Sequence, residues 1–238
     1  MNSKGILYLI PNVLSPDTAL KVIAPAVKEV ISQTSYFLVE DLRTARRYIS
    51  SLKLGVDLEK VRMEVLDKKT PAHEVEKLME PVLRGENAGI VSDAGCPGIA
   101  DPGAMAVAYA QKKDIQVVPL AGPSSMFLAL MGSGLNGQSF SFGGYLPIDR
   151  KERIAAIKSL EEQSKRNNST QMFMETPFRN RKLMEDLLHH LQPETLLCVA
   201  SNLTGQGEFL KTKRVLDWRK SVPNLHKIPT VFLLLVER

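Results

Sequence analysis

The sequence predicts an α/β fold of two αβα domains, the first on a five-stranded, mainly parallel, doubly wound sheet and the second on a mixed sheet. Short apolar runs alternate with helix-type segments along the first half, which favours parallel strands joined by right-handed crossovers. A second alternation follows, but its last strands lie too close to their neighbours for every crossover to be helical. We therefore expect one domain over residues 1–119 and another over 120–238.

The composition is that of an ordinary globular protein. Of the 238 residues, 44% are hydrophobic and 24% are charged. No apolar run is long enough to cross a bilayer, and the one at the N-terminus is too short for a signal-peptide core. Cys96 and Cys198 lie in unrelated contexts and form no metal-ligand pattern. We expect a cytoplasmic protein without a metal site.

The net charge of +5 favours an anionic partner such as RNA or a polycarboxylate. The basic residues are dispersed apart from two short clusters, and we interpret each cluster as a solvated face. The clusters are Arg43, Arg46 and Arg47, and Lys211, Lys213 and Arg214.

Proline and cap residues predict where the helices of the first domain begin. Ser15 is placed to cap a helix with Pro16 at its first position, where the missing N–H costs nothing, and Pro25 should kink or split that helix. The pairs Thr70-Pro71 and Asp101-Pro102 repeat the pattern, and a further helix is predicted over residues 41–52. The predicted strands are residues 5–10, 36–40, 61–66, 88–92 and 115–120.

The segment PLAGPSS, residues 119–125, predicts a hinge between the two domains. Beyond it, Asp149 and Glu152 form a capping-box pattern that opens a helix, and a second helix is predicted over 180–191. The predicted strands of the second domain are residues 139–146, 171–175, 196–204, 208–216 and 227–237.

The loop VSDAGCPGIADPG, residues 91–103, follows the fourth strand, where parallel sheets bind their ligands. Ala94 and Gly95 carry little or no side chain, so a ligand can approach the backbone there. Asp93 can accept hydrogen bonds from a ligand amine or hydroxyl, and Asp101 caps the next helix. Taken alone, the loop is equally consistent with a Gly/Pro-rich turn that only reverses the chain.

The common nucleotide and hydrolase motifs are missing. The sequence contains no G-x-G-x-x-G after the first strand, no G-x-x-x-x-G-K-[ST] and no G-x-S-x-G. No His/Cys/carboxylate cluster suggests a catalytic metal, and the pair His189-His190 is interpreted as helix surface. Tyr145 can stack on a base or on the adenine, with packing in a core as the alternative, and Trp218 is expected to pack in a core.

Four segments occur in a specific order: VSDAGCPGIADPG at 91–103, VVPLAGPSS at 117–125, GGYLP at 143–147 and FMETPFR at 173–179. In this order they resemble the tetrapyrrole methylase superfamily of S-adenosylmethionine-dependent methyltransferases. The likeness is greatest to the branch that methylates a ribose 2′-hydroxyl of cytidine in bacterial 16S ribosomal RNA, and it runs nearly end to end.

The resemblance implies two α/β domains with S-adenosylmethionine in the cleft between them, usually in a homodimer. It also implies which positions bind the cofactor: the turn after the first strand, the loop after the fourth, the hinge, and loops of the second domain. Matched residue by residue, these are Pro11, Asp93, Ala94, Gly95, Cys96, Pro97, Gly122, Pro123, Ser124, Ser125, Met174, Asn202, Leu203, Thr204 and Pro229.

Two segments depart from the ribosomal branch. Its turn after the first strand is Pro-Thr-Pro-Ile-Gly-Asn-Leu-like, whereas this chain has PNVLSPD at 11–17; its His-x-His-Asn-Glu-like stretch is replaced by LDKKT at 66–70. Because that turn lines the active cleft in the family, the substrate contacts there must differ. Three hypotheses therefore stay open: a ribosomal RNA acceptor, an anionic small-molecule acceptor such as a tetrapyrrole precursor, and a cofactor-binding protein that has lost its chemistry.

A hydroxyl acceptor must lose its proton during methyl transfer, and a nearby carboxylate can accept it. Asp93 and Glu175 are the predicted catalytic residues, with Glu40 and Asp41 as further candidates. For Asp93, hydrogen bonding within the loop or to the cofactor is an equal alternative. The predicted substrate-binding residues are Arg43 and Arg179. For Arg179 the alternative is an ion pair with Glu175 that holds the turn.

Overall fold

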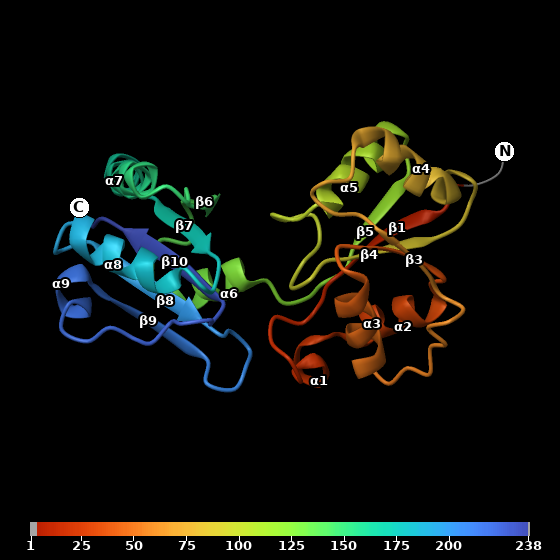
Figure 1. Ribbon diagram of the computed structural model, residues 1–238, viewed down its shortest axis with the longest axis horizontal. Coiled ribbons are helices and arrows are strands. Elements are labelled where there is room, and N and C mark those ends of the chain that lie inside the picture. The colour runs from red at the N-terminus through yellow and green to blue at the C-terminus, as the bar shows by residue number, and fades with distance from the viewer. Residues whose placement is uncertain (1–3, 238) are drawn as a thin grey trace. The chain divides into compact units, whose positions relative to one another are not determined.

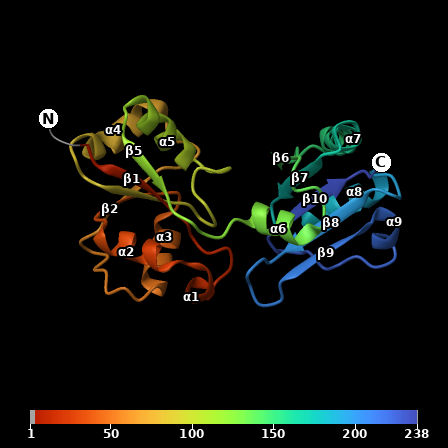
Figure 2. The same cartoon turned by 180° about the vertical axis from the view of Figure 1, so that it is seen from behind.

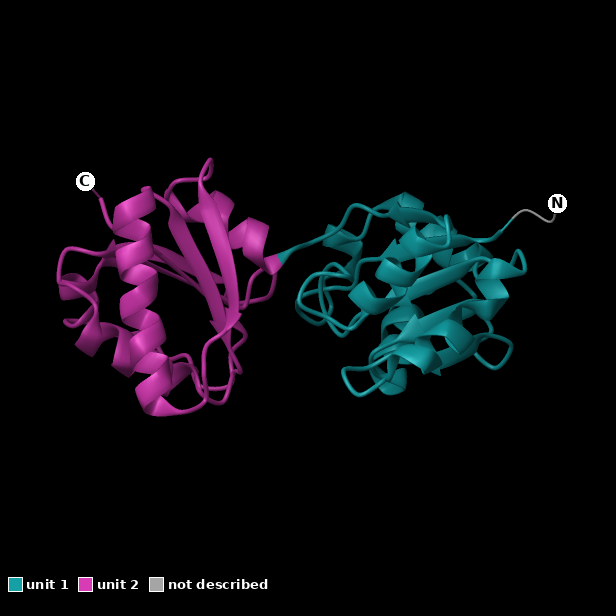
Figure 3. Ribbon diagram, turned by 90° about the horizontal axis from the view of Figure 1, so that it is seen from above, with its two compact units in different colours: residues 1–124 teal, residues 125–238 magenta. Residues whose placement is uncertain are grey.

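In the computed structural model, which describes residues 4–237, the chain divides into two compact units. The units are residues 1–124 and 125–238 (Figure 3). The boundary lies at the end of the segment 119–125. Each unit has its own sheet and its own buried core, so each is described by itself.

The first unit contains a five-stranded sheet in the order β3-β2-β4-β1-β5. Every neighbouring pair is parallel, which confirms the predicted parallel doubly wound sheet. The central strands β2 and β4 are buried along their whole length, and this is why they appear in the sequence as unbroken apolar runs. The strands are β1 (Ile6–Ile10), β2 (Tyr36–Val39), β3 (Arg62–Val65), β4 (Ala88–Val91) and β5 (Gln116–Pro119).

Helices cover both faces of this sheet (Figure 1). On one face α4 (Ala72–Leu83) and α5 (Gly103–Lys112) pack on a core that includes Leu38. On the other face α1 (Ala19–Val22), α2 (Pro25–Gln33) and α3 (Leu42–Ser51) pack on a core that includes Phe37. Successive residues of β2 thus supply opposite cores, as the two-residue period of a strand requires.

Two helix starts differ from the prediction. The helix expected from Ser15 begins only at Ala19, because Asp17 has a φ of 61° and the Thr18 hydroxyl donates to the Ser15 carbonyl at 2.7 Å, closing a turn instead. Pro25 starts a separate helix, so the predicted split is confirmed. At α4 the cap residue is Pro71 and not Thr70.

The second unit contains a five-stranded sheet in the order β6-β7-β10-β8-β9 (Figure 2). The pair β6–β7 is parallel and the other three pairs are antiparallel, so the predicted mixed sheet is confirmed. The strands are β6 (Phe140–Tyr145), β7 (Thr170–Glu175), β8 (Leu196–Ser201), β9 (Phe209–Arg214) and β10 (Thr230–Leu235).

Three helices share one core of the second unit: α7 (Arg150–Asn167), α8 (Asn180–His190) and α9 (Val215–Trp218). The predicted cap of α7 is confirmed, since the Asp149 carboxylate accepts from the Glu152 N–H at 3.0 Å. The helix α6 (Ser125–Ser133) packs on the other face, where Gly132 meets Leu210 of β9. The adjacent residue Phe209 belongs to the opposite core, as strand alternation requires.

Candidate active site

The carboxyl ends of the parallel strands meet at one edge of the first sheet. Ile10 of β1 and Val39 of β2 both pair with Val91 of β4, and Leu9 of β1 pairs with Pro119 of β5. The segments that follow these strands therefore leave the sheet side by side. Most of the cofactor residues predicted for the first unit lie in them: Pro11, Asp93, Ala94, Gly95, Cys96, Pro97, Gly122 and Pro123.

Asn12 joins the turn after β1 to the loop after β4. Its N–H donates to the Gly95 carbonyl at 2.8 Å, and its carbonyl accepts from the Gly95 N–H at 3.2 Å. Its side-chain Nδ2 donates to the carbonyls of Ser92 at 3.0 Å and Asp93 at 3.1 Å. Asn12 is only 2% exposed, so these bonds replace the water that its polar groups lose on burial. The sequence alone does not distinguish Asn12 as a key residue, because asparagine is common in turns for purely local reasons.

Gly95 is needed for the shape of the loop. Its φ of 72° lies in the left-handed region, and the side chain of Leu14 lies against the position that a Cβ would take. Both of its backbone polar groups are bonded to Asn12. The residues of this bend that face outward are Asp93 and Ala94, which are exposed.

The segment after β5 packs closely on the same two loops. A side-chain carbon at Gly122 would collide with the ring of Pro11, so this position accepts only glycine without rearrangement. The Cys96 thiol lies 3.7 Å from the Gly122 carbonyl and 3.5 Å from the Pro123 carbonyl. Pro11, Cys96, Gly122 and Pro123 are therefore brought together. Ser124 and Ser125 stand on either side of the boundary between the units.

Carboxylates gather at the ends of β2 and β4. The Asp93 N–H donates to Glu40 Oε2 at 3.4 Å. Burial raises the pKa of Glu40, and the nearby charges of Asp93 and Asp101 raise it further. Burial, and then the charge of Asp41, raises the pKa of Asp93. Asp93 and Glu40 thus hold a proton more readily than ordinary surface carboxylates.

The Asp101 carboxylate accepts hydrogen bonds from the backbone of its own loop. It accepts from the Gly98 N–H at 3.0 and 2.9 Å and from the Gly103 N–H at 2.6 Å. Gly103 is the first residue of α5, so the Asp101 carboxylate bonds the first N–H of that helix, although the N-cap residue is Pro102 and not Asp101 as predicted. Asp41 is the N-cap of α3, and its carboxylate accepts from the Thr44 N–H at 2.7 Å.

The predicted residues of the second unit also gather at one edge of their sheet. Thr230, the first residue of β10, pairs with Glu175 at the end of β7 and with Ser201 at the end of β8. The Asn202 N–H donates to the Pro229 carbonyl at 2.9 Å. The structure therefore brings together Met174, Glu175, Asn202, Leu203, Thr204 and Pro229.

Glu175 and Arg179 form an ion pair, the alternative considered for this arginine. Arg179 Nη2 lies 2.6 Å from Glu175 Oε1, and the Glu175 side chain is only 1% exposed. The same oxygen accepts from the Thr176 N–H at 2.6 Å, so the carboxylate holds the turn between β7 and α8. Arg179 keeps a side-chain exposure of 28%.

This edge carries buried polar atoms that lack a partner within the described residues. They come from the end of β7, the start of α8 and the loop after β8: Glu175 Oε2, Arg179 Nε, Asn180 Oδ1 and Thr204 Oγ1. Buried polar groups without partners are rare in folded proteins and indicate a missing partner. The set contains donors and acceptors, which fits a ligand with amino, hydroxyl and carboxylate groups such as S-adenosylmethionine.

A cavity of about 230 Å³ opens in the first unit beside Asp93. One wall is the turn after β1, and the other is the polar side of α3. Tyr48 forms part of it, and its hydroxyl donates to the Pro11 carbonyl at 2.7 Å. The cavity is lined by Asn12, Val13, Leu14, Ser15, Pro16, Asp17, Thr44, Arg47, Tyr48, Ser51, Asp93 and Ala94. The predicted substrate residue Arg43 is exposed near the start of α3 but is not in this lining.

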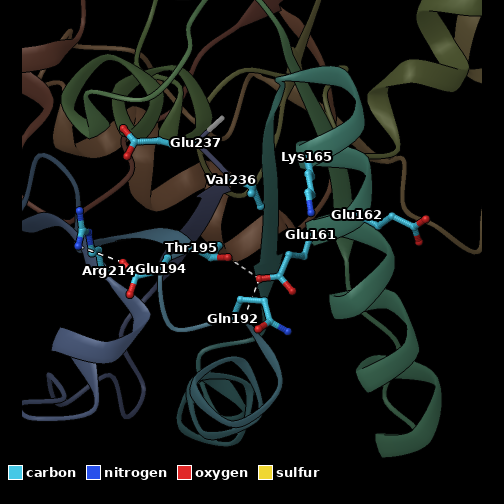
Figure 4. A pocket seen from close by; sticks show the side chains of 9 residues that line it. All are labelled: Glu161, Glu162, Lys165, Gln192, Glu194, Thr195, Arg214, Val236 and Glu237. Atoms are coloured by element: carbon cyan, nitrogen blue, oxygen red, sulfur yellow. Dashed lines mark hydrogen bonds and ion pairs between the residues drawn. The ribbon is translucent and has the colours of Figure 1, made fainter.

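A larger cavity of about 440 Å³ lies in the second unit, beside α7 and the start of β8 (Figure 4). Two side-chain pairs lie in its lining. Glu161 accepts from the Thr195 hydroxyl and from the Gln192 N–H, the latter at 2.8 Å, and Arg214 pairs with Glu194 at 3.0 Å. None of the predicted site residues lines this cavity.

Other residues singled out in the sequence have structural roles. Trp218 is 1% exposed and donates to the Leu197 carbonyl at 2.8 Å, which confirms the expected packing. Tyr145 is 51% exposed at the end of β6. His189 and His190 contact each other edge to face on α8. Within residues 4–237, no group of His, Cys, Asp and Glu side chains is arranged to hold a metal ion, and no helix is long and apolar enough to span a membrane.

The fold of the chain resembles that of solved methyltransferases. The chain superposes on the methyltransferase CobJ with a TM-score of 0.64, covering 98% of this chain and 94% of CobJ at 17% identity. For the uroporphyrin-III-C-methyltransferase from Thermus thermophilus the TM-score is 0.54, with 98% and 93% coverage and 17% identity. At this identity the likeness shows a shared fold.

Sequence comparison gives the family. The model for tetrapyrrole (corrin/porphyrin) methylases matches residues 17–215. The ribosomal RNA small subunit methyltransferase I of Vibrio cholerae serotype O1 is 30% identical over 210 residues, which cover 88% of this chain and 69% of that protein. Its counterpart in Escherichia coli O157:H7 is 29% identical, with 98% and 78% coverage. The chain therefore belongs to the tetrapyrrole methylase family and is an S-adenosylmethionine-dependent methyltransferase.

Proposed function

We propose that this protein transfers the methyl group of S-adenosylmethionine to a ribose 2′-hydroxyl of small-subunit ribosomal RNA. The observation that carries the proposal is the similarity to ribosomal RNA small subunit methyltransferases over 88% and 98% of the chain. The net charge of +5 is consistent with a polyanionic acceptor. A cytoplasmic location and a homodimer are further parts of the proposal.

In each unit, the loops at the described sheet edge carry the residues proposed to contact the donor. In the second unit, the proposed donor contacts include Glu175 Oε2 and Thr204 Oγ1, buried atoms that lack a partner within the described residues. In the first unit, Asp93 and Ala94 face outward from a bend held by Asn12. When bound, S-adenosylmethionine supplies a methyl group bonded to a positively charged sulfur. Transfer forms the methyl–oxygen bond and breaks the methyl–sulfur bond, and the sulfur leaves as a neutral thioether.

The protein has two tasks in this reaction. The first is to hold the acceptor oxygen in line with the methyl carbon, and such orientation can lower a barrier by roughly 7–11 kcal/mol. The second is to receive the hydroxyl proton. Asp93 is the proposed base because its side chain lines the cavity and partial burial raises its pKa, which brings its basicity closer to that of an effective proton acceptor.

A methyl-transfer assay tests the acceptor. Radiolabelled S-adenosylmethionine is incubated with the protein and, separately, with small ribosomal subunits, total RNA or a tetrapyrrole precursor. We expect label in the RNA of the small subunit, resistant to alkali at one ribose position because a 2′-O-methyl group blocks cleavage. Label only in the tetrapyrrole would replace the proposed acceptor, and cofactor binding without transfer to any acceptor would favour a protein that has lost its chemistry.

A further inference from the structure

The cavity beside Asp93 has a volume and a lining that binding of the methyl donor does not explain. It lies within the first unit, between the turn after β1 and α3, and its volume is about 230 Å³. Pockets that enclose a whole organic ligand usually measure about 300–1,000 Å³. This cavity is thus suited to part of a molecule, such as a sugar with its phosphate, and is too small for a tetrapyrrole ring.

The lining from α3 follows one stripe of the helix. Thr44, Arg47, Tyr48 and Ser51 are spaced i, i+3, i+4 and i+7, which places them on the same side of an α-helix. Arg46 is absent from this lining. Arg43, Arg46 and Arg47 are spaced i, i+3 and i+4 and so lie toward one side of α3, but Arg47 is the one of the three that lines the cavity.

Arg47 is the cationic side chain of the lining. Within residues 4–237 it takes part in no ion pair and no side-chain hydrogen bond, whereas Arg62, Arg150, Arg153 and Arg179 are each paired with a carboxylate. A guanidinium that is held beside a cavity without a protein partner is available to a phosphate, which it can bind through two parallel hydrogen bonds.

The other polar groups of the cavity suit a sugar. Asp17 and Asp93 provide carboxylate oxygens, which accept hydrogen bonds from hydroxyl groups. Val13, Leu14 and the ring of Tyr48 provide apolar surface, as the faces of a ribose require. A free inorganic anion would be repelled by the two carboxylates, whereas a sugar-phosphate can direct its hydroxyls to them and its phosphate to Arg47.

We propose that this cavity binds one ribose-phosphate unit of the RNA acceptor, with Arg47 on the phosphate and the hydroxyls directed to Asp93. The inference rests on the proposed function, since it assigns the acceptor's place beside the proposed base. It extends that function by naming a binding residue, Arg47, and a cavity that neither the family match nor the relatives assign.

The test compares Arg47→Gln with Arg46→Gln, a matched control on the same helix with the same loss of charge. Both side chains are exposed, so both variants are expected to fold. Binding of a fluorescein-labelled single-stranded RNA of mixed sequence is measured by anisotropy over a range of salt. We expect Arg47→Gln to weaken binding about tenfold, because the charge-assisted contact of the guanidinium with the phosphate is lost. We also expect the slope of log K against log salt to fall in magnitude by about 0.7, the value for one phosphate contact on a single strand.

Two further measurements separate this inference from the proposed function. Arg47→Lys should keep the salt slope but not the full affinity, because lysine retains the charge without the two-pronged geometry. In the methyl-transfer assay, Arg47→Gln should raise the KM for small subunits while the affinity for S-adenosylmethionine is unchanged. Equal RNA binding by Arg47→Gln and Arg46→Gln would overturn the inference even if the wild type methylates the subunit. Arg47-dependent RNA binding without methyl transfer would support the cavity and refute the proposed reaction.

Discussion

Asp93 and Glu40 lie next to each other where β4 and β2 end, and their carboxyl groups have different roles. Glu40 accepts from the Asp93 backbone at 3.4 Å, so it helps to hold the bend. The Asp93 side chain is exposed and lines the cavity of the first unit. Of the carboxylates considered in the sequence, Asp41 caps α3 and Glu175 pairs with Arg179. Asp93 is therefore the one of the four whose carboxylate accepts no hydrogen bond and forms no ion pair within the described residues.

The replacement Asp93→Asn tests its proposed role as base. If the carboxylate receives the proton, turnover should fall by about 10²–10⁴-fold while the affinity for S-adenosylmethionine is retained. The base acts only when ionised, so the wild-type rate should fall as the pH drops through the raised pKa of Asp93, and this acidic limb should be lost in the variant. The measurement is a pH profile of single-turnover methyl transfer.

Asp17→Asn is the comparison variant, because Asp17 lines the same cavity and asparagine tolerates its φ of 61°. As a proposed contact of the acceptor it should change the affinity for RNA and leave the acidic limb of the pH profile in place. A loss of turnover in both variants would point to the charge of the cavity and not to a base. Unchanged turnover in Asp93→Asn would remove Asp93 from the chemistry.

At the scale of elements, the two loops beside the cavity are one unit of structure. The turn after β1 departs from the ribosomal branch of the family, and Asn12 in that turn carries the contacts that hold the loop after β4. The departure therefore preserves an ordered bend through this chain's own hydrogen bonds. Loss of these bonds should affect the fold before it affects any ligand.

Asn12→Asp should destabilise the protein by about 1–3 kcal/mol, the cost of leaving buried polar groups unsatisfied. The carboxylate cannot donate to the carbonyls of Ser92 and Asp93, and it places a negative charge against them. Asn168→Asp is the same chemical change at an exposed cap of α7 and should be nearly neutral. Urea unfolding of both variants measures the difference, and equal midpoints would show that Asn12 does not hold the loops.

At the scale of the whole molecule, the proposed donor residues come from both units. Residues 93–97 and 122–123 belong to the first, and Glu175 and Thr204 to the second. Each unit has its own core, so each can unfold in its own transition. The response of these transitions to ligand reports which unit binds it.

S-adenosylmethionine should stabilise the protein against heat. At a concentration of 100 times the Kd, linkage adds about 2.7 kcal/mol to the unfolding free energy of the part that binds. We expect every resolved transition in a calorimetric scan to move to higher temperature with ligand, and Thr204→Val to reduce the shift. A shift confined to one transition would assign the donor to one unit alone, and no shift at all would contradict the donor site.

The sequence predicted most of the fold because the patterns that encode it are local. Apolar runs at strand length and caps such as Asp149 depend on residues within a few positions of one another, and both were found where expected. Ser15 failed as a cap because the left-handed conformation of Asp17 closes a turn before the helix can begin. Neither helix propensity nor the spacing of apolar residues predicts that a particular aspartate adopts the left-handed conformation.

Within the candidate site, the sequence by itself determined which loops are concerned: those after β1, β4 and β5, and those around Glu175 and Asn202. The pair of Arg179 with Glu175, four residues apart, was already open to the sequence as an alternative, and the structure selected it. Only the tertiary structure decided the contacts between distant segments: it assigned Gly95 to a bridge with Asn12 and Arg47 to a cavity wall beside Asp93. The reason is that these contacts join segments that become neighbours only when the sheet forms, so no local pattern can encode the pairing.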